Sequence, residues 1–389
     1  MKNIILHRSC PACGNQIGRQ LYRIDYKLPD DIHLGNGYDI VCCDNCGNCY
    51  ADTASSKEDY DDYYNHNNYY GGGWKFNAST DYDYAVISRI LAAYLSEDSM
   101  ILDMGCGNGN LLNYLRQEGY HNLVGIDPSE ASIDSIVQYG FQGIIGSVYQ
   151  PPLSDIKVDF VIMTMVFEHL LCPEEAIDNI RKNYLKKDGY LLLTWPRFED
   201  LMIDQTPIVN NFNHEHINYF SVKTADILLG RCGFERVCAH TSIGFQRNML
   251  TTLSNVVLYR RMDSKTDLIE KDEITEKSIR EYVVRGEKEE EELICIIERL
   301  AHDAEPVVVW GTGSYMMHLM AVSDLSKCDI RCFVDNNRLK QGKTLYGYSV
   351  ESPDFLREFS GKVVITVMLY REEIKKQIDG MGNNSLMII

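Results

Sequence analysis

The chain has 389 residues, of which 45% are hydrophobic and 24% charged, and its formal net charge at pH 7 is −18. This length predicts two or three domains, and the acidic balance disfavours a nucleic-acid ligand, whose backbone requires a basic surface. The sequence has no apolar run near the roughly 20 residues that cross a bilayer and no secretory signal at its start. We therefore expect a cytoplasmic protein without a membrane partner.

Six of the 13 cysteines lie in the first 49 residues, and in a reducing compartment such clustering indicates metal binding rather than disulfides. Two Cys-x-x-Cys pairs can supply the four thiolates of a closed zinc site, which is typical of a structural ion. The alternatives are an iron–sulfur cluster and free buried cysteines. The expected ligands are Cys10, Cys13, Cys43 and Cys46. We favour the pair at 43 and 46 because it follows an expected strand at 38–41 and precedes a glycine. The roles of Cys42 and Cys49 stay open, since residues 46 and 49 form a third pair.

Residues 57–75 are rich in Tyr, Asp, Asn and Gly, a composition typical of a loop or linker. Residues 85–96 then have the apolar spacing of a helix. Beyond them, apolar runs alternate with helical patterns, which predicts a doubly wound α/β fold with a parallel sheet. The expected strands are 100–104, 122–126, 143–146, 159–164 and 190–195, and the expected helices are 110–118, 129–139 and 174–185.

The C-terminal third predicts a charged helix and then a second α/β segment. Residues 266–303 carry acidic and basic runs around a few apolar positions, as a solvated helix with one packed face does. Strands are expected at 307–310, 330–334 and 362–368. A Gly-rich turn at 311–314 and the acid Asp335 follow the first two of these strands, a pattern typical of nucleotide binding. The alternative is a related fold that only packs or dimerises.

A Gly-rich loop joins the strand at 100–104 to the following helix. It contains Asp103, Gly105, Gly107 and Gly109, and glycines at such a turn let the backbone approach a ligand closely. Asp127 ends the next strand, where a carboxylate can accept the two ribose hydroxyls of an adenosine ligand. The spacing differs from the G-x-G-x-x-G of dinucleotide-binding folds, which remain the alternative.

The loop resembles motif I of the class I S-adenosylmethionine-dependent methyltransferases. Residues 159–162, 166–170 and 187–193 resemble, in the same order, the fourth strand, the segment after it and the fifth strand of that family. The resemblance implies S-adenosylmethionine as the cofactor. The candidate cofactor-binding residues are Asp103, Gly105, Gly107, Gly109, Asp127, Pro128, Ser147 and Met165.

A run of ionisable side chains follows the fifth expected strand. His214, Glu215 and His216 can join His169 in an acid/base group over one pocket, because imidazole is the usual proton carrier near neutral pH. The alternative is that His169 only shapes the cofactor pocket and that the residues after 216 cap the next helix.

The whole order of segments resembles the three-domain sugar C-methyltransferases, which act on nucleotide-linked 4-keto-deoxysugars. The resemblance implies a zinc-binding domain at 1–60, a methyltransferase domain at 61–250, a helical connector at 251–303 and a Rossmann-like domain at 304–389 that helps to hold the nucleotide-sugar. It places His169, His214, Glu215 and His216 at the sugar, with Tyr69 or Tyr70. The ketone would acidify the neighbouring C–H, and the resulting enolate would attack the sulfonium methyl.

Three segments depart from that family. Asn213 stands where the family tends to carry Tyr, Gly71–Gly73 replaces a Ser-rich stretch, and residues 365–374 look like modules of polysaccharide-locus enzymes. O-methylation of a polysaccharide-pathway sugar or of another small metabolite is therefore an alternative, as is a non-catalytic scaffold that binds cofactor or nucleotide-sugar. An anionic sugar nucleotide needs a basic pocket in this acidic chain, and Lys340, Lys343 and Arg197 are the candidates. The sequence is compatible with a monomer or a dimer.

Overall fold

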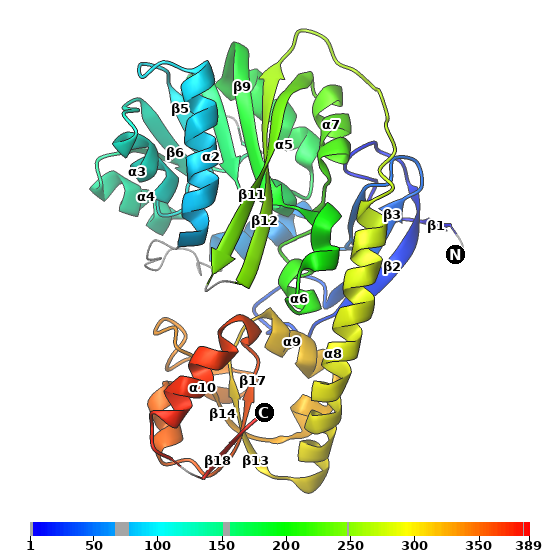
Figure 1. Cartoon of the computed structure of the whole chain (residues 1–389), viewed down its shortest axis with the longest axis vertical. Coiled ribbons are helices and arrows are strands. Elements are labelled where there is room, and N and C mark those ends of the chain that lie inside the picture. The colour runs from blue at the N-terminus through cyan, green and yellow to red at the C-terminus, as the bar shows by residue number, and fades with distance from the viewer. Residues whose placement is uncertain (1–2, 67–77, 151–155, 247–248, 384) are drawn as a thin grey trace. The chain divides into compact units, whose positions relative to one another are not determined.

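A seven-stranded sheet forms the centre of the larger of two compact units in the computed structural model, which describes residues 3–66, 78–150, 156–246, 249–383 and 385–389 (Figure 1). The first unit comprises residues 1–21, 39–204 and 215–280 and the second comprises 22–38, 205–214 and 281–389. Within the described residues, no helix is long and apolar enough to span a bilayer.

The strand order of this sheet is β11-β12-β9-β8-β5-β6-β7, and β12 runs antiparallel to both of its neighbours. The strands are β5 (Ile101–Met104), β6 (Leu123–Asp127), β7 (Gln142–Ile145), β8 (Val158–Thr164), β9 (Leu185–Pro196), β11 (Phe234–Gln246) and β12 (Met249–Arg261). The chain moves outward from β5 to β7 and then returns to β8 on the other side of β5. This reversal opens a crevice at the carboxyl ends of the strands, where ligands of such sheets bind.

Helices cover both faces of the sheet (Figure 1). The first unit contains α1 (Lys57–His66), α2 (Ala78–Tyr94), α3 (Asn110–Gln117), α4 (Glu130–Gln138), α5 (Pro173–Asn179), the π-helical turn η2 (Ile180–Tyr184), α7 (Val222–Arg231) and the short 3-10 helices η1 (Phe167–His169) and η3 (Phe198–Ile203). Side chains of α2, α3 and α4 share one apolar core with β5, β8 and β12. Local capping sets helix starts: the Ser129 hydroxyl accepts the Ser132 N–H at α4, and Ser221 forms a capping box with Thr224 at α7.

The cysteine-rich segment forms a second, five-stranded sheet with the order β1-β2-β3-β4-β10. Its strands are β1 (Ile4–Ile5), β2 (Ile17–Asp25), β3 (Gly37–Cys43), β4 (Cys49–Asp52) and β10 (Asn218–Tyr219). The strand β10 pairs antiparallel with β4, so that Asn218 lies opposite Tyr50. A segment that follows β9 by more than twenty residues is thus an edge of the cysteine sheet.

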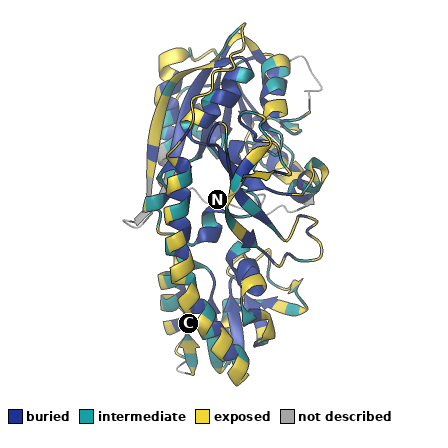
Figure 2. Ribbon diagram, turned by 90° about the vertical axis from the view of Figure 1, so that its right-hand side faces the viewer, coloured by how far each residue is buried: buried dark blue, intermediate teal, exposed yellow. Residues whose placement is uncertain are grey.

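The second unit is built on a six-stranded sheet with the order β15-β16-β14-β13-β17-β18, in which only the β15–β16 pair is antiparallel. Its elements are α6 (Ile208–Asn211), β13 (Pro306–Trp310), α9 (Ser314–Val322), η4 (Asp324–Lys327), β14 (Asp329–Val334), β15 (Thr344–Leu345), β16 (Tyr348–Glu351), η5 (Pro353–Arg357), β17 (Gly361–Ile365), η6 (Met368–Tyr370), α10 (Arg371–Asp379) and β18 (Leu386–Ile388). The helix α8 (Thr275–Asp303) precedes it, with one face buried and the other exposed (Figure 2).

The alternating pattern expected at 100–195 is confirmed as an α/β fold with a mainly parallel sheet. Two parts differ from the expectation. Residues 57–66, expected to be a loop, form α1, because its tyrosines recur at helical spacing and can be buried. The antiparallel hairpin of β11 and β12 was not expected, because its strands mix polar and apolar residues without strict alternation.

Candidate active site

The Gly-rich loop joins the end of β5 to the start of α3. Gly105 has a φ of +82°, and a Cβ placed there would lie 2.5 Å from Cγ2 of Val166. A side chain at this position would therefore be strained and would also collide with the segment after β8. The N–H groups of Gly105 and Cys106 both donate to the carbonyl of Ile126, at 2.7 and 3.0 Å, which fixes the loop against the end of β6.

Asp127 is held at the end of β6 by two backbone donors. The Gly107 N–H donates to Oδ2 and the Ser129 N–H donates to Oδ1, both at 2.9 Å. Burial raises the pKa of Asp127, and these two hydrogen bonds act against that rise. The carboxylate is thus oriented with lone pairs left for the two hydroxyls of a ribose.

Asp103 lies beneath the loop and is 1% exposed. Its Oδ1 has no hydrogen-bond partner among the described residues. Burial, followed by the negative charge of Asp127, raises the pKa of Asp103 to about 7. A positively charged ligand group next to this carboxyl would favour its ionised form.

A cavity of about 610 Å³ opens beside the loop, at the carboxyl ends of β5, β6 and β8. Six of the eight expected cofactor residues line it: Gly105, Gly107, Asp127, Pro128, Ser147 and Met165. Asp103 and Gly109 are not among the residues that line it. Gly109 is the N-cap residue of α3 and has a left-handed backbone conformation. Met165 also has a positive φ, of +53°, while its N–H donates to the carbonyl of Thr194 at 3.1 Å. Strained backbone of this kind is frequent at ligand sites.

The other end of the cavity is lined by α1, by the 3-10 helix η1 and by His216. The Tyr64 hydroxyl lies 3.0 Å from Nδ1 of His169, and the ring of His216 meets the ring of His169 edge-on at 5.0 Å between centroids. Glu168 is fully buried, with Oε1 3.6 Å from Nε2 of His169. Burial by itself would lower the pKa of His169, but the carboxylates of Glu168 and Glu215 outweigh it and raise that pKa above its ordinary value.

The run from 214 to 216 is divided between the two units. Glu215 and His216 belong to the first unit, where Oε1 of Glu215 accepts the Tyr63 hydroxyl at 2.6 Å. His214 belongs to the second unit and packs its ring edge-on against Tyr26, at 6.0 Å between centroids. Tyr69 and Tyr70, the expected tyrosines of the sugar site, lie outside the described residues.

The sequence reasoning missed the tyrosines of α1 and the role of Glu168. Tyr60 and Tyr64 line the cavity, and Tyr63 contacts Glu215. Their spacing of three and four residues places them on one face of a helix, and that signal was present in the sequence. Glu168 was recognised only as part of a motif.

Arg8 connects the cysteine sheet to the end of the cavity that is lined by His169 and His216. Its guanidinium donates to the carbonyls of Leu170, Leu171 and Ile217 at 3.2, 2.7 and 3.1 Å, and to Oδ1 of Asn218 at 2.7 Å. The two segments that carry His169 and His216 are therefore fixed by one side chain. Burial lowers the pKa of Arg8, while the nearby tyrosines act in the opposite direction and raise it.

The four expected metal ligands converge at one end of the cysteine sheet. The Sγ atoms of Cys10 and Cys46 lie 3.6 Å apart, as do those of Cys13 and Cys43, and all four lie within 4.8 Å of one another. Four sulfurs bound tetrahedrally to zinc at ~2.3 Å would lie about 3.8 Å apart. The thiolate cage thus fits a zinc ion.

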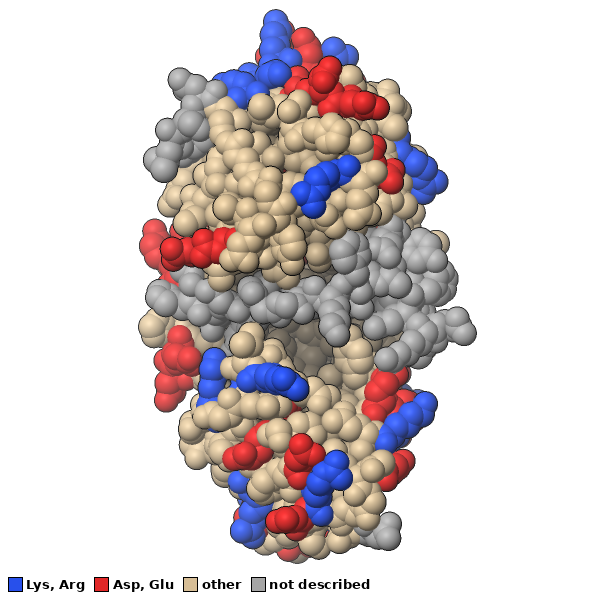
Figure 3. Space-filling model, turned by 90° about the vertical axis from the view of Figure 1, so that its left-hand side faces the viewer, with Lys and Arg blue, Asp and Glu red and all other residues tan. Residues whose placement is uncertain are grey.

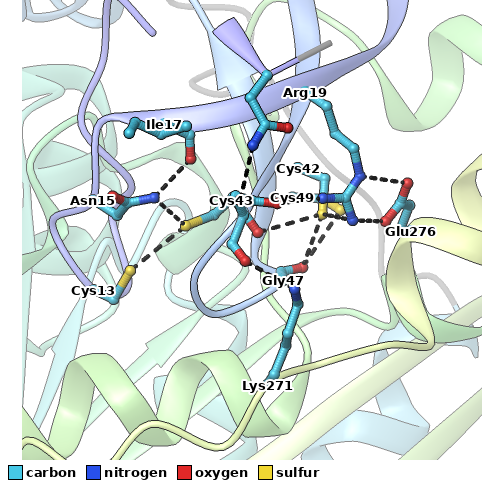
Figure 4. A network of polar contacts seen from close by, with 12 residues as sticks. Cys13, Asn15, Ile17, Arg19, Cys42, Cys43, Gly47, Cys49, Lys271 and Glu276 are labelled. Carbon is cyan, nitrogen blue, oxygen red and sulfur yellow. Dashed lines mark hydrogen bonds and ion pairs between the residues drawn. The ribbon is translucent and has the colours of Figure 1, made fainter. Parts of the chain in front are cut away.

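Cys42 and Cys49 form a separate pair. They lie opposite each other in the β3–β4 hairpin, and the Arg19 guanidinium, which pairs with Glu276, donates to Sγ of Cys42 at 3.7 Å (Figure 4). Consecutive residues of a strand point to opposite faces, so Cys42 cannot face the cage that Cys43 enters. Asn15 donates to Sγ of Cys43 at 3.5 Å on the cage side.

The three expected basic residues have local partners or lie at the surface. Nε of Arg197 pairs with Asp200 and Nζ of Lys340 lies 3.6 Å from Oδ2 of Asp335, while Lys343 is exposed. On the face drawn in Figure 3, basic and acidic side chains are interspersed. This mixture differs from the basic stripe typical of nucleic-acid-binding surfaces.

Comparisons with known proteins agree with this geometry. Residues 79–239 match a family described as a methyltransferase domain, and residues 303–389 match one described as C2185-like, N-terminal. A protein of Encephalitozoon cuniculi named as a methyltransferase is 30% identical over 31% of this chain and 55% of its own length. EEF1A lysine methyltransferase 2 of Danio rerio is 29% identical over 28% of this chain and 53% of its own length. The protein-lysine N-methyltransferase EFM4 of Saccharomyces cerevisiae is 27% identical over 28% and 56%, respectively.

The chain spans about half the length of the curated relatives it matches. Among solved structures, the magnesium protoporphyrin IX methyltransferase of Synechocystis is 18% identical, with a TM-score of 0.40, over 53% of this chain and 100% of that one. The matched residues 79–239 build most of the seven-stranded sheet and the end of the cavity beside the Gly-rich loop. Residues 79–239 of this chain therefore match a methyltransferase domain, and they fold as the doubly wound α/β sheet described above.

Proposed function

We propose that this protein transfers a methyl group from S-adenosylmethionine to a nucleotide-activated sugar. The observation that carries the proposal is the group of Tyr64, His169 and His216, which lines the same cavity as the cofactor loop. An acceptor held there would have titratable side chains on the side away from the cofactor. Methyl transfer requires such an arrangement, because the acceptor must lose a proton and attack in line.

The cofactor-binding end is assigned to the loop and to two carboxylates. Asp127 would bind the ribose hydroxyls, Asp103 would lie near the positively charged methionine part, and Gly105 would let the backbone pass close to it. When bound, the cofactor supplies an electrophilic methyl group. The protein contributes by holding the ligand and by excluding water from the cavity.

At the acceptor end, the imidazoles of His169 and His216 accept the proton that the methyl acceptor loses. In a 4-keto-sugar the carbonyl acidifies the neighbouring C–H, so an imidazole that removes this proton yields an enolate. Tyr64, hydrogen-bonded to Nδ1 of His169, orients that ring. C-methylation follows from attack by the enolate carbon, and O-methylation would follow if a hydroxyl were the acceptor instead.

We also infer that the cysteine cage holds one structural Zn²⁺. Four thiolates complete the coordination of zinc and leave no position for a substrate. Cys10, Cys13, Cys43 and Cys46 have the mutual spacing of such a site. We further propose that the second unit binds a nucleotide, because a Gly-rich turn at 311–314 and Asp335 follow the first two strands of its mainly parallel sheet.

A second candidate is methylation of a protein lysine. Two of the curated relatives are named for that activity, and they match about half of their own length. A lysine acceptor must lose one proton from its ammonium group, which the same imidazoles can accept. The two candidates differ in the acceptor and not in the cofactor site.

One assay separates these candidates. The zinc-loaded full-length chain is incubated with methyl-labelled S-adenosylmethionine and either nucleotide-activated 4-keto and 4-hydroxy sugars or a lysine-containing protein. Label on sugar carbon, with loss of deuterium from the position next to the ketone, supports C-methylation, whereas label on sugar oxygen supports O-methylation. Label only on protein lysine would replace the sugar by the second candidate. A chain that neither binds S-adenosylmethionine nor is stabilised by it would overturn the proposal.

His169→Gln and His121→Gln form a matched pair for this assay. The first change removes an imidazole at the acceptor end of the cavity, and the second removes an exposed imidazole elsewhere. We expect methyl transfer to fall by roughly 100-fold or more in the first variant, as for loss of a general base, and to be unchanged in the second.

A further inference from the structure

We propose that Glu168, His169 and His216 bind a divalent first-row transition metal ion at the acceptor end of the cavity. Each residue offers one donor atom, and the three atoms lie within 4.8 Å of one another. The inference rests on the proposed function, since it places the ion beside the methyl acceptor. It concerns a different site from the cysteine cage, with nitrogen and oxygen donors in place of sulfur.

Glu168 is the residue whose surroundings point most directly to a bound cation. Its side chain is fully buried, and neither carboxylate oxygen has a hydrogen-bond partner among the described residues. A buried carboxylate without a hydrogen bond is strongly destabilising, and proteins compensate such groups by an ion pair, here the 3.6 Å contact with His169, or by a metal. The nearest polar atom recorded for it, Nε2 of His169, is 3.6 Å from Oε1, which leaves space between them.

The surroundings of His169 select the ring nitrogen that faces the carboxylate. The Tyr64 hydroxyl lies 3.0 Å from Nδ1. If Nδ1–H donates to that oxygen, Nε2 carries the lone pair and faces Glu168. Metal-bound imidazoles commonly have this arrangement, in which the second nitrogen is fixed by a hydrogen bond and the first is free to coordinate.

His216 supplies the third donor from a separate segment. Its ring lies edge-on to that of His169, at 5.0 Å between centroids, and it directly precedes the residues that lead into β10. Two imidazoles and one carboxylate are the donors of sites that bind zinc or ferrous iron and keep positions open for a substrate. Glu168, His169 and His216 all line the cavity, so the open positions would face the acceptor.

The ion would act on the acceptor through its charge. A bound divalent cation lowers the pKa of an oxygen that it coordinates and stabilises negative charge that develops there. This would serve the oxygen of an enolate as well as a hydroxyl acceptor. With the ion bound, both imidazoles are ligands, so metal-assisted and imidazole-assisted proton removal are alternatives that experiment can separate.

The test is a titration with Co²⁺ of the full-length chain that has been loaded with one equivalent of Zn²⁺, which fills the cysteine cage only. Cobalt bound to nitrogen and oxygen donors gives visible d–d absorption without the thiolate-to-metal charge-transfer bands that would report the cysteine cage. We expect one equivalent of Co²⁺ per chain with the nitrogen–oxygen spectrum, displaced by added Zn²⁺. Glu168→Gln and His216→Gln should each weaken this binding by at least about tenfold, and Tyr64→Phe by about tenfold through His169.

Two controls keep the test decisive. His121→Gln should leave the Co²⁺ titration unchanged, and the S-adenosylmethionine affinity of each variant should stay near that of the wild type, which shows that the variants are folded. Absence of the nitrogen–oxygen spectrum, or its survival in both Glu168→Gln and His216→Gln, would overturn the inference. A chain that binds S-adenosylmethionine but not Co²⁺ overturns the metal site alone, whereas a chain that fails to bind S-adenosylmethionine overturns the proposed function.

Discussion

The cysteine cage and the group of Glu168, His169 and His216 both gather potential metal donors, yet they differ in completeness. The cage has four sulfurs at the spacing of a closed tetrahedral site, away from the cavity. The second group has three mixed donors that line the cavity, one of them a buried carboxylate with no hydrogen-bond partner in the described part of the chain. A closed donor set stabilises a fold, whereas an open one can contact a substrate. The predictions below test that distinction, beginning with the largest effect.

Removal of one cage ligand should have the greatest consequence. Cys46→Ala leaves three thiolates, so we expect loss of the zinc and of several kcal/mol of folding free energy, because a structural zinc site contributes to stability directly. Zinc content and denaturant unfolding measure both. Cys49→Ala is the matched control, since this buried thiol lies outside the cage, and it should keep the zinc. Equal zinc loss in the two variants would contradict the assignment of the cage.

Asp103 offers a second buried carboxyl for comparison with Glu168. Its pKa is raised to about 7 by burial and by Asp127, so the folded state binds its proton more tightly than the unfolded state. This group contributes its full stabilisation below about pH 4. As the pH rises from there to about 7, the free energy of unfolding falls by up to about 4 kcal/mol. Asp103→Asn should remove this slope.

The measurement is urea unfolding of the ligand-free chain between pH 4 and 8. At each pH, the free energy of unfolding of the variant is subtracted from that of the wild type. Cys106 and Asp127 are the titratable groups recorded near this carboxyl, and both remain in the variant. A difference that does not change over this range would refute the prediction.

At the cofactor end, Asp127→Asn should weaken S-adenosylmethionine binding by roughly 10- to 100-fold, since hydrogen bonds to a charged group contribute about 1.5–3 kcal/mol. Calorimetric titration measures the affinity. Asp134→Asn, on the exposed face of α4, is the control and should bind as the wild type does. If both variants bind equally, Asp127 does not hold the ribose.

The smallest effect is expected for Tyr64→Phe. Loss of the hydroxyl at Nδ1 of His169 removes one hydrogen bond, worth about 1 kcal/mol, so kcat/KM should fall several-fold. Tyr139→Phe, at an exposed position, should have no effect. An unchanged kcat/KM in Tyr64→Phe would show that the orientation of the His169 ring does not depend on the Tyr64 hydroxyl.

The sequence predicted what is local, namely the two cysteine pairs that the structure brings together and the Gly-rich loop with Asp127. Each of these depends on residues close together in the chain or at the ends of neighbouring strands. It did not identify Tyr63, Tyr64 or Arg8 as parts of the acceptor end. The spacing of the tyrosines indicates a shared helix face, but the groups that they and Arg8 contact lie more than a hundred residues away in the chain, and no local pattern encodes those contacts. The hairpin of β11 and β12 was missed for a similar reason. Its strand structure depends on the pairing of β12 with β9, which lies more than fifty residues earlier in the chain.

The contacts of Arg8 limit how far the chain can be shortened from its N-terminal side. The residues matched as a methyltransferase domain begin at 79. The helix α1, which lines the cavity, lies before them, and so does Arg8, which holds Leu170 and Leu171 of the cavity wall. A chain shortened to the matched residues would lose the four hydrogen bonds that hold the segments around His169 and His216. Such a fragment could keep its affinity for the cofactor and still lose its acceptor. Under the proposed function, zinc occupancy of the cage would then affect the efficiency of methyl transfer without any contact between the ion and the substrate.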